Sequence, residues 1–255
     1  MSSRKEREKR REQRLREESP ADRGDRRTKL LQVAAGAVFL AIAVVVVLIV
    51  VNSSGEGGGD ARNLKDVAAV DRLLGGVPQD GLVLGDPKAK VELIEFGDLQ
   101  CPVCKAYSEE ILPELIDAKV KSGEVKIAFR NYTIIGDQST AAGAAALAAG
   151  AQGRGWNYIE LFYRNQGVEN SGYADDEFLT AIAKGAGVDD IGRWNKERKS
   201  AKLTGEVSAT TAEAERLGLT GTPSFAVEGP GTEGMEILGT PGSAGEIESA
   251  LEAAS

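Results

Sequence analysis

The chain contains only two cysteines, and they lie three residues apart in the tetrapeptide Cys101-Pro102-Val103-Cys104. The apolar run 91–96 before this tetrapeptide predicts a buried strand, and the helix-like spacing of apolar residues after it predicts a helix that begins here. Cys101 is therefore expected at a helix N-terminus, where unpaired backbone N–H groups and the helix dipole stabilise a thiolate. Two thiols in this setting indicate redox chemistry.

The two cysteines are expected to play different roles. Cys101 is the predicted nucleophile, because a helix start within a C-x-x-C motif lowers the pKa of a thiol from its ordinary value of about 8.5. Cys104, one turn later and buried beneath it, is the predicted resolving thiol that attacks the mixed disulfide. Pro102 fits the first turn of the helix, because the N–H that it lacks has no partner there.

Three alternatives remain open for this pair of cysteines: a structural disulfide, half of a zinc site, and two inert buried thiols. A structural disulfide would add little to the stability of the fold here, because it would close a minimal loop. Zinc normally takes four Cys or His ligands, and the chain has no histidine and no third cysteine. The sequence therefore predicts neither a metal nor an organic cofactor at the pair.

The run Leu30–Val51 is apolar except for Gln32, and it is long enough to span a bilayer as a helix, which takes roughly 20 residues. A buried core helix is one alternative, but the run lacks the polar face of an amphipathic helix. A cleavable signal peptide is the other, but its apolar region is shorter and ends in an A-x-A-like site. We interpret the run as a retained transmembrane anchor.

Charge divides the chain into two parts. Residues 1–29 contain 12 Lys or Arg and 7 Asp or Glu, a balance of +5, so the chain total of −8 leaves −13 for the rest. Positive charge beside a spanning helix favours the cytoplasmic side, so residues 1–29 are a predicted cytoplasmic tail and the cysteines are expected outside the membrane. The negative remainder disfavours nucleic acid as a partner.

The remaining residues divide into a predicted linker, 52–81, and one predicted domain, 82–255. The linker begins with a glycine-rich, flexible stretch and contains a possible short helix at 66–74. In the domain, strand 91–96, a helix that Pro113 should interrupt, and strand 125–130 predict a parallel βαβ unit.

An almost wholly helical segment, at about 138–217, reads as a subdomain inserted into the sheet domain. Its stripe of Trp156, Ile159 and Phe162 is predicted to be core. Two strands, at 224–227 and 236–238, and a helix from Ser243 complete an α/β fold. The predicted helices of the insertion are 140–151, 156–163, 175–186 and 203–217, with a possible fifth at 189–194.

Two segments, E-F-G-D-L-Q-C-P-V-C at 95–104 and G-L-T-G-T-P-S-F at 218–225, resemble the DsbA-like thiol:disulfide oxidoreductases of the thioredoxin fold, in particular membrane-anchored or secreted bacterial members. The resemblance runs from about residue 82 to the C-terminus. It implies that Thr222-Pro223 is a cis peptide beside the disulfide and that the Thr222 backbone pairs with an extended substrate. It also implies that Glu95 is a buried acid that assists proton transfer at Cys104; the alternative is a carboxylate exposed to water at a strand end.

The residues between the cysteines depart from the strongest oxidants of that family, which often have a histidine there. Val103 can donate neither a hydrogen bond nor a charge to the Cys101 sulfur, and Lys105 is the only local positive charge. With Pro102, these residues are the predicted redox-tuning set. We expect the pKa of the Cys101 thiol to be higher, and its reduction potential to be less oxidising, than in the strongest oxidants.

The resemblance implies an extracytoplasmic, membrane-tethered dithiol oxidase that introduces disulfides into exported proteins. Because the chain shows no flavin or quinone site, a separate quinone-linked oxidase in the membrane would have to reoxidise it. A disulfide isomerase or reductase of the same fold is the nearest alternative. A noncatalytic binding or scaffold protein with a structural disulfide, and a thiol peroxidase, are alternatives of other kinds.

Overall fold

The computed structural model describes residues 64–255. The predicted tail, the predicted anchor at 30–51 and the first part of the predicted linker lie outside these residues. Within residues 64–255, every helix is too short or too polar to cross a membrane.

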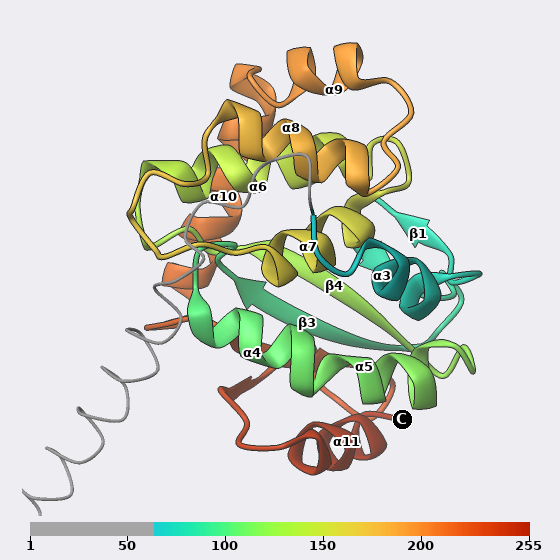
Figure 1. Ribbon diagram of the computed structural model, residues 1–255. Helices are drawn as coiled ribbons and strands as arrows, with labels where there is room; N and C mark the ends of the chain where they lie inside the picture. The colour runs from blue at the N-terminus through green and yellow to red at the C-terminus, as the bar shows by residue number, and fades with distance from the viewer. Residues whose placement is uncertain (1–63) are drawn as a thin grey trace, which may run out of the picture. The chain divides into compact units, whose positions relative to one another are not determined.

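A six-stranded mixed sheet with the order β1-β2-β4-β3-β5-β6 forms the centre of the fold (Figure 1). The two central strands, β3 (Val91–Gly97) and β4 (Val125–Asn131), are parallel, which confirms the predicted βαβ unit. All other neighbouring strands pair antiparallel. These strands are β1 (Gln79–Asp80), β2 (Val83–Leu84), β5 (Ser224–Glu228) and β6 (Glu236–Gly239).

The crossover between β3 and β4 is a broken helix. It consists of α4 (Pro102–Glu110), α5 (Leu112–Leu115) and a π-helical turn, η1 (Ile116–Val120). Pro113 lies in the first turn of α5, so the predicted interruption is confirmed. The break occurs because proline has no N–H to donate to the preceding turn.

The predicted helical insertion is confirmed as five helices between β4 and β5. Figure 1 shows α8 and α9 stacked beyond α7, on the side away from β3. The last helix, α11 (Ala244–Ala253), follows β6. Its N-cap is Ser243, whose hydroxyl accepts a hydrogen bond from the Glu246 N–H. The inserted helices are α6 (Asp137–Gly150), α7 (Gly155–Arg164), α8 (Asp176–Gly185), α9 (Ile191–Glu197) and α10 (Ala201–Arg216).

The domain begins earlier than residue 82, so the prediction of a linker over 52–81 is wrong for its last part. Helix α3 (Val67–Leu74) packs on α7, and β1 joins the sheet. The Gln79 side chain holds β1 in place: its amide donates to Asn157 Oδ1 at 2.7 Å, and its carbonyl accepts from the Trp156 N–H at 3.0 Å. These partners lie more than 70 residues away, so the local pattern carried no signal of the strand.

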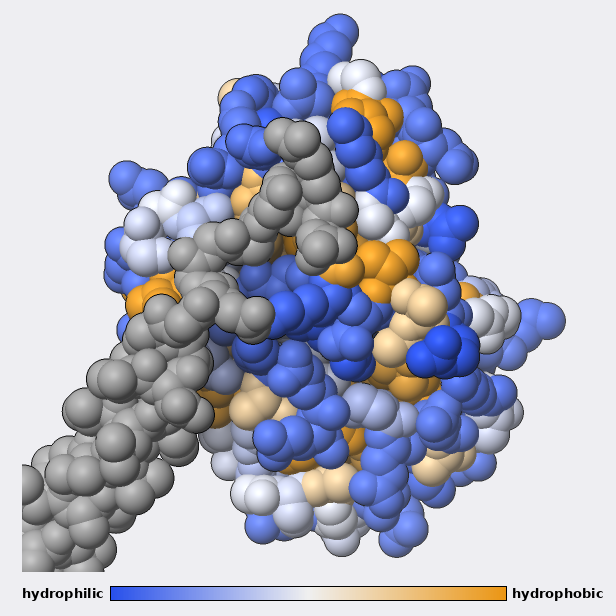
Figure 2. Space-filling view, viewed as in Figure 1, coloured by the Kyte–Doolittle hydropathy of each residue, from blue (hydrophilic) through white to orange (hydrophobic). Residues whose placement is uncertain are grey.

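The two faces of β3 differ, because successive side chains of a strand point to opposite sides. Leu93 lies on the face covered by α4, α5 and α7, in the large core that contains Trp156 and Phe162. This confirms the prediction that the aromatic stripe of α7 is core. Ile94 belongs to a smaller cluster on the other face. Figure 2 shows a mainly hydrophilic surface with small, separate apolar patches.

Candidate active site at the start of α4

The cysteines lie where β3 passes into α4, as predicted. Cys101 is the N-cap of α4, and its sulfur accepts a hydrogen bond from the Cys104 N–H at 3.4 Å. Cys101 is 5% exposed, and Cys104 is fully buried one turn further along the helix. Both are free thiols in this structure. Both cysteines are buried, but only Cys101 keeps some contact with solvent.

Asp98 shapes the turn between β3 and the cysteines. Its fully buried carboxylate accepts hydrogen bonds from the backbone N–H groups of Gln100, Ile134 and Ile135, at 2.9, 2.9 and 3.1 Å. Its carbonyl oxygen accepts the Cys101 N–H at 2.9 Å. This role was not predicted from the sequence. An acidic residue directly after a buried strand and three residues before the first cysteine was the available signal.

The helical insertion also holds this turn. The Gln166 side-chain amide, just after α7, donates to the carbonyl oxygens of Leu99 and Cys101, at 2.7 and 3.1 Å. Gln100 donates to the Ser139 hydroxyl of α6 at 2.9 Å. Sequence analysis missed Gln166 because it lies in a loop, where no periodicity marks a residue. The insertion therefore positions the reactive turn directly.

The segment before β5 completes the site. Thr222-Pro223 is a cis peptide, as the resemblance implied. The Cys101 thiol donates to the Thr222 carbonyl oxygen at 3.3 Å, so residues 121 positions apart in the chain meet at the reactive sulfur. Pro223 is buried, and its carbonyl oxygen accepts from the Thr240 hydroxyl at 2.7 Å.

Hydrogen-bond donors stabilise the Cys101 thiolate. The largest effect is a hydrogen bond from the Cys104 thiol. The Thr222 side chain and the backbone N–H groups of Cys104 and Val103 add to it, and burial opposes it. Together they lower the pKa of Cys101 to about 6. Val103 is 47% exposed beside the sulfur. Lys105 is half-buried, and a redox-tuning role for its charge stays a prediction.

Alkylation of the reduced full chain tests this thiolate. Because the thiolate is the nucleophile, we expect the alkylation rate of Cys101 to rise with pH through a midpoint of about 6. Cys104 should stay unmodified until the protein unfolds, because it is buried and its pKa is raised. Iodoacetamide labelling followed by peptide mass spectrometry measures both rates. Equal labelling of the two cysteines, or a midpoint above about 8, would contradict this account of the site.

Glu95 lies in the core rather than in water, so the alternative of an exposed carboxylate is wrong. It is fully buried, and neither of its carboxyl oxygens has a hydrogen-bond partner among the described residues. Burial, and then the charges of Glu160 and Cys101, raise the pKa of Glu95 to about 8. Burial is also the main cause of the raised pKa of Cys104, and the charge of Glu95 contributes. Protonated Glu95 is the form that can give a proton to a Cys104 thiolate, and this role of Glu95 stays a prediction.

A second buried acid, Glu160 on α7, was missed by sequence analysis. It is fully buried, and its oxygens accept from the Ser108 hydroxyl at 3.0 Å and from Arg164 at 3.5 Å. The available signal was an acidic residue within the apolar stripe of α7, followed four residues later by an arginine. Residues 64–255 contain no group of three Cys, Asp or Glu side chains arranged to hold a metal ion.

Three comparisons place this geometry among known proteins. The family model described as "Thioredoxin" matches residues 78–237. The "Probable disulfide bond formation protein D" of Bacillus cereus is 30% identical over 149 residues, which cover 57% of this chain and 69% of that protein.

Two solved structures share the fold. BdbD from Bacillus subtilis superposes with a TM-score of 0.60 at 22% identity, over 69% of this chain and 95% of that one. A thioredoxin-like oxidoreductase from Silicibacter pomeroyi superposes with a TM-score of 0.54 at 27% identity, over 74% and 96% of the two chains. The predicted thioredoxin fold is thereby confirmed.

Proposed function

We propose that this chain, which belongs to the DsbA-like thiol:disulfide oxidoreductases of the thioredoxin family, oxidises pairs of thiols in exported proteins. Thiol:disulfide exchange is the activity of the family. The oxidising direction, the location outside the cytoplasm and the partners are the proposal. The observation that carries the direction is the stabilised thiolate of Cys101: whatever stabilises the reduced form of a dithiol makes its disulfide a stronger oxidant.

The reaction is two successive thiol:disulfide exchanges. A substrate thiolate attacks the Cys101 sulfur, the Cys101–Cys104 bond breaks, and the departing Cys104 thiolate takes a proton that Glu95 can supply. A second substrate thiolate then attacks the first substrate sulfur, and Cys101 leaves as a thiolate. Two electrons pass to the protein: the substrate dithiol becomes a disulfide, and the protein disulfide becomes a dithiol. Because its thiolate is stabilised, Cys101 is a good leaving group in the second step.

The substrate would lie against the segment before β5. The backbone of Thr222 adjoins the reactive sulfur, so an extended substrate segment can pair with it while its cysteine reaches Cys101. In the oxidised protein Cys101 carries no thiol hydrogen, so the Thr222 carbonyl oxygen would accept a hydrogen bond from the substrate backbone instead. The buried Pro223 would keep the Thr222 backbone next to the Cys101 sulfur.

The apolar run 30–51 and the positive residues before it support a single-pass anchor with the domain outside the cytoplasm. Each turnover leaves the protein reduced, so a membrane oxidase linked to quinone would restore the disulfide. Labelling of intact cells with a membrane-impermeant maleimide after mild reduction tests this location: Cys101 should react without lysis. Labelling that requires lysis would place the domain inside.

Direct transfer tests the function. The oxidised full chain is mixed with an equal amount of an unfolded protein that carries one reduced pair of cysteines, and the substrate disulfide is followed by mass spectrometry. We expect nearly complete transfer, faster than with the same concentration of glutathione disulfide. If the dithiol stays reduced while the reduced chain rapidly reduces the matching disulfide protein, the electron flow runs the other way.

A reductase is the second candidate, and one observation favours it. The pKa of Cys101, about 6, lies closer to that of thioredoxin, about 7, than to that of the strongest oxidant, about 3.5. A reductase would require a supply of electrons from the cytoplasm in place of an oxidase. Membership in the oxidoreductases favours a catalytic protein over the noncatalytic scaffold that the sequence left open.

A further inference from the structure

Glu160 is a buried acid that the exchange reaction described above does not use. It is fully buried on α7, and its partner Ser108 lies on α4, the helix that carries Cys104. Ser108, its partner at 3.0 Å, follows Cys104 by one helical turn on α4, so the two point to the same face of that helix. Glu95 lies on β3, on the face that α4 and α7 cover, two residues from Leu93.

We propose that Glu160 and Glu95 form a coupled pair of buried carboxyl groups that together hold one proton beside Cys104, so that Glu160 is a positioning residue for proton transfer at that thiol. Glu160 acts through Glu95 rather than on either sulfur. The inference rests on the proposed function in one respect, namely that Cys104 gains and loses a proton in each cycle.

The two carboxyl groups have unequal surroundings, which decides where the proton lies. Arg164 and the Ser108 hydroxyl stabilise the ionised form of Glu160, whereas Glu95 has no hydrogen-bond partner among the described residues. The proton therefore lies mainly on Glu95, and the negative charge lies on Glu160. The pKa of Glu160 is raised to about 7 by burial, and Arg164 limits this rise.

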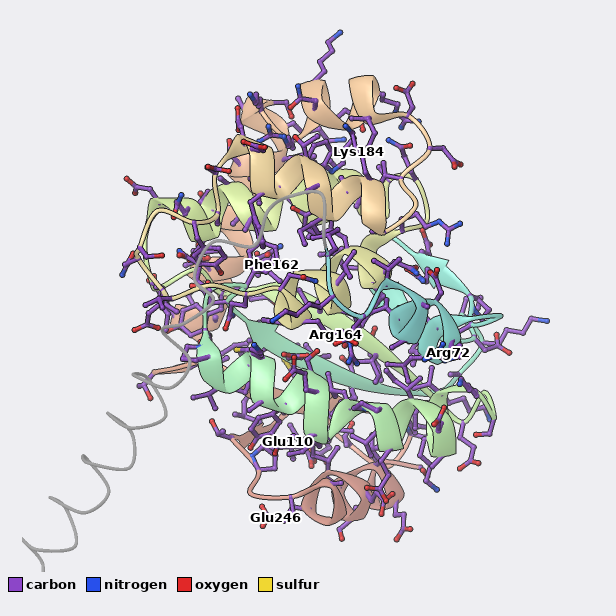
Figure 3. All side chains as sticks on the ribbon, viewed as in Figure 1. Arg72, Glu110, Phe162, Arg164, Lys184 and Glu246 are labelled. Carbon is purple, nitrogen blue, oxygen red and sulfur yellow. The ribbon has the colours of Figure 1, made fainter. Side chains whose placement is uncertain are left out.

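Arg164 links the pair to the surface. Its side chain is 15% exposed, while that of Glu160 is fully buried, so the guanidinium bridges water and the buried acid. Arg164, labelled in Figure 3, is the last residue of α7, the helix that packs against α4. The charge of Glu109 on α4 also acts on Glu160 and disfavours its ionised form.

This arrangement explains how a buried thiol can lose and regain a proton. When Glu95 gives its proton to the Cys104 thiolate, both carboxyl groups are briefly ionised. Two like charges in one low-dielectric site repel each other strongly. The pair therefore recovers a proton from water on the Arg164 side, and Glu95 is ready for the next cycle. When the Cys104 thiol loses its proton and the Cys101–Cys104 disulfide forms again, the same path carries the proton to water.

The test uses a reaction internal to the full chain. Cys101 is converted to its mixed disulfide with thionitrobenzoate; Cys104 then attacks the Cys101 sulfur, the disulfide forms and coloured thionitrobenzoate is released. The release rate should rise with pH as Glu95 ionises and becomes able to accept the Cys104 proton. In Glu160→Gln the midpoint should fall by roughly one pH unit, because the charge that opposes ionisation of Glu95 is gone.

Two matched variants separate this effect from a merely structural one. Glu160→Asp keeps the carboxyl group, so its midpoint should lie much closer to that of the wild type than the midpoint of Glu160→Gln does. Glu110→Gln removes the same charge from an exposed position on α4, labelled in Figure 3, and should leave the midpoint unchanged. A folded Glu160→Gln variant with the wild-type midpoint would overturn the proposal. The fluorescence of the two buried tryptophans, Trp156 and Trp194, reports whether each variant is folded.

A second measurement keeps the test decisive if Glu160→Gln does not fold. In the wild-type chain with ¹³C-labelled glutamate, the Glu95 and Glu160 carboxyl signals should each titrate in two steps, because each senses the ionisation of the other. A single step for Glu95 would overturn the coupling. Neither measurement involves an exported protein, so a failure of the proposed oxidase function would leave both results standing.

Discussion

Replacing Cys101 with serine lowers dithiol oxidation by the full chain to the uncatalysed background rate. A single sulfur cannot hold the protein disulfide that accepts two electrons, and the hydroxyl at position 101 is not ionised at neutral pH. The buried Cys104 cannot take over, because it is fully buried and its pKa is raised. The measurement is formation of the substrate disulfide by mass spectrometry under the conditions used for the wild type.

The matched variant Cys104→Ser gives a different result. It keeps the Cys101 sulfur and replaces the Cys104 thiol with a hydroxyl, which can also donate a hydrogen bond to the Cys101 thiolate. The variant should therefore attack a substrate disulfide and accumulate as a covalent mixed disulfide that nothing resolves. Non-reducing electrophoresis detects this species. If Cys101→Ser, rather than Cys104→Ser, accumulated the mixed disulfide, the assignment of nucleophile and resolving thiol would be reversed.

Replacing Glu95 with glutamine stabilises the folded protein at neutral and alkaline pH. The pKa of Glu95 is raised in the folded state to about 8 from an ordinary 4.5, so the folded state binds the proton more tightly than the unfolded state does. Stability is therefore lost as pH rises from about 4.5 to about 8. Each unit corresponds to about 1.4 kcal/mol, so the loss reaches about 4 to 5 kcal/mol.

The variant should escape this loss. Its free energy of unfolding should equal that of the wild type below about pH 4.5, and the advantage should grow to several kcal/mol above about pH 8. Denaturant unfolding followed by fluorescence measures it, because both tryptophans of the chain are fully buried. Glu92→Gln removes the same charge from the same strand at a half-buried position and serves as the control. An advantage that did not depend on pH would show that Glu95 has no raised pKa.

The same variant should also act more slowly. Glutamine cannot exchange a proton with Cys104, so resolution of the mixed disulfide should slow by about a hundredfold, the lower end of what a positioned acid or base contributes. A more stable but slower enzyme is the combination expected when a buried acid that destabilises the fold takes part in the reaction.

Sequence patterns predicted the part of the site that depends on local structure. The position of Cys101 at a helix N-terminus follows from a strand pattern before it and a helix pattern after it, and both are confirmed. The cis peptide at Thr222-Pro223 was expected only from the resemblance, because local residues do not distinguish it from a trans turn. The break at Pro113 follows from the missing N–H of proline.

The residues that sequence analysis missed are held by partners far away in the chain. Asp98 binds the backbone at 134 and 135, Gln166 binds the turn before Cys101, and Gln79 fastens β1 to α7. No periodic pattern records such hydrogen bonds. Glu160 was visible as an acid in an apolar stripe, but only the packing of α4 against α7 shows that it lies beside the redox site.

The reduction potential of the Cys101–Cys104 couple in the full chain tests the central claim most directly. The protein is equilibrated with glutathione buffers of known ratio, and the fraction of disulfide is measured after acid quenching. A pKa of about 6 at Cys101 stabilises the dithiol moderately, so we predict a value of about −180 mV, milder than the roughly −120 mV of the strongest oxidant. A value near about −270 mV, typical of thioredoxin, would contradict the oxidising direction and support a reductase.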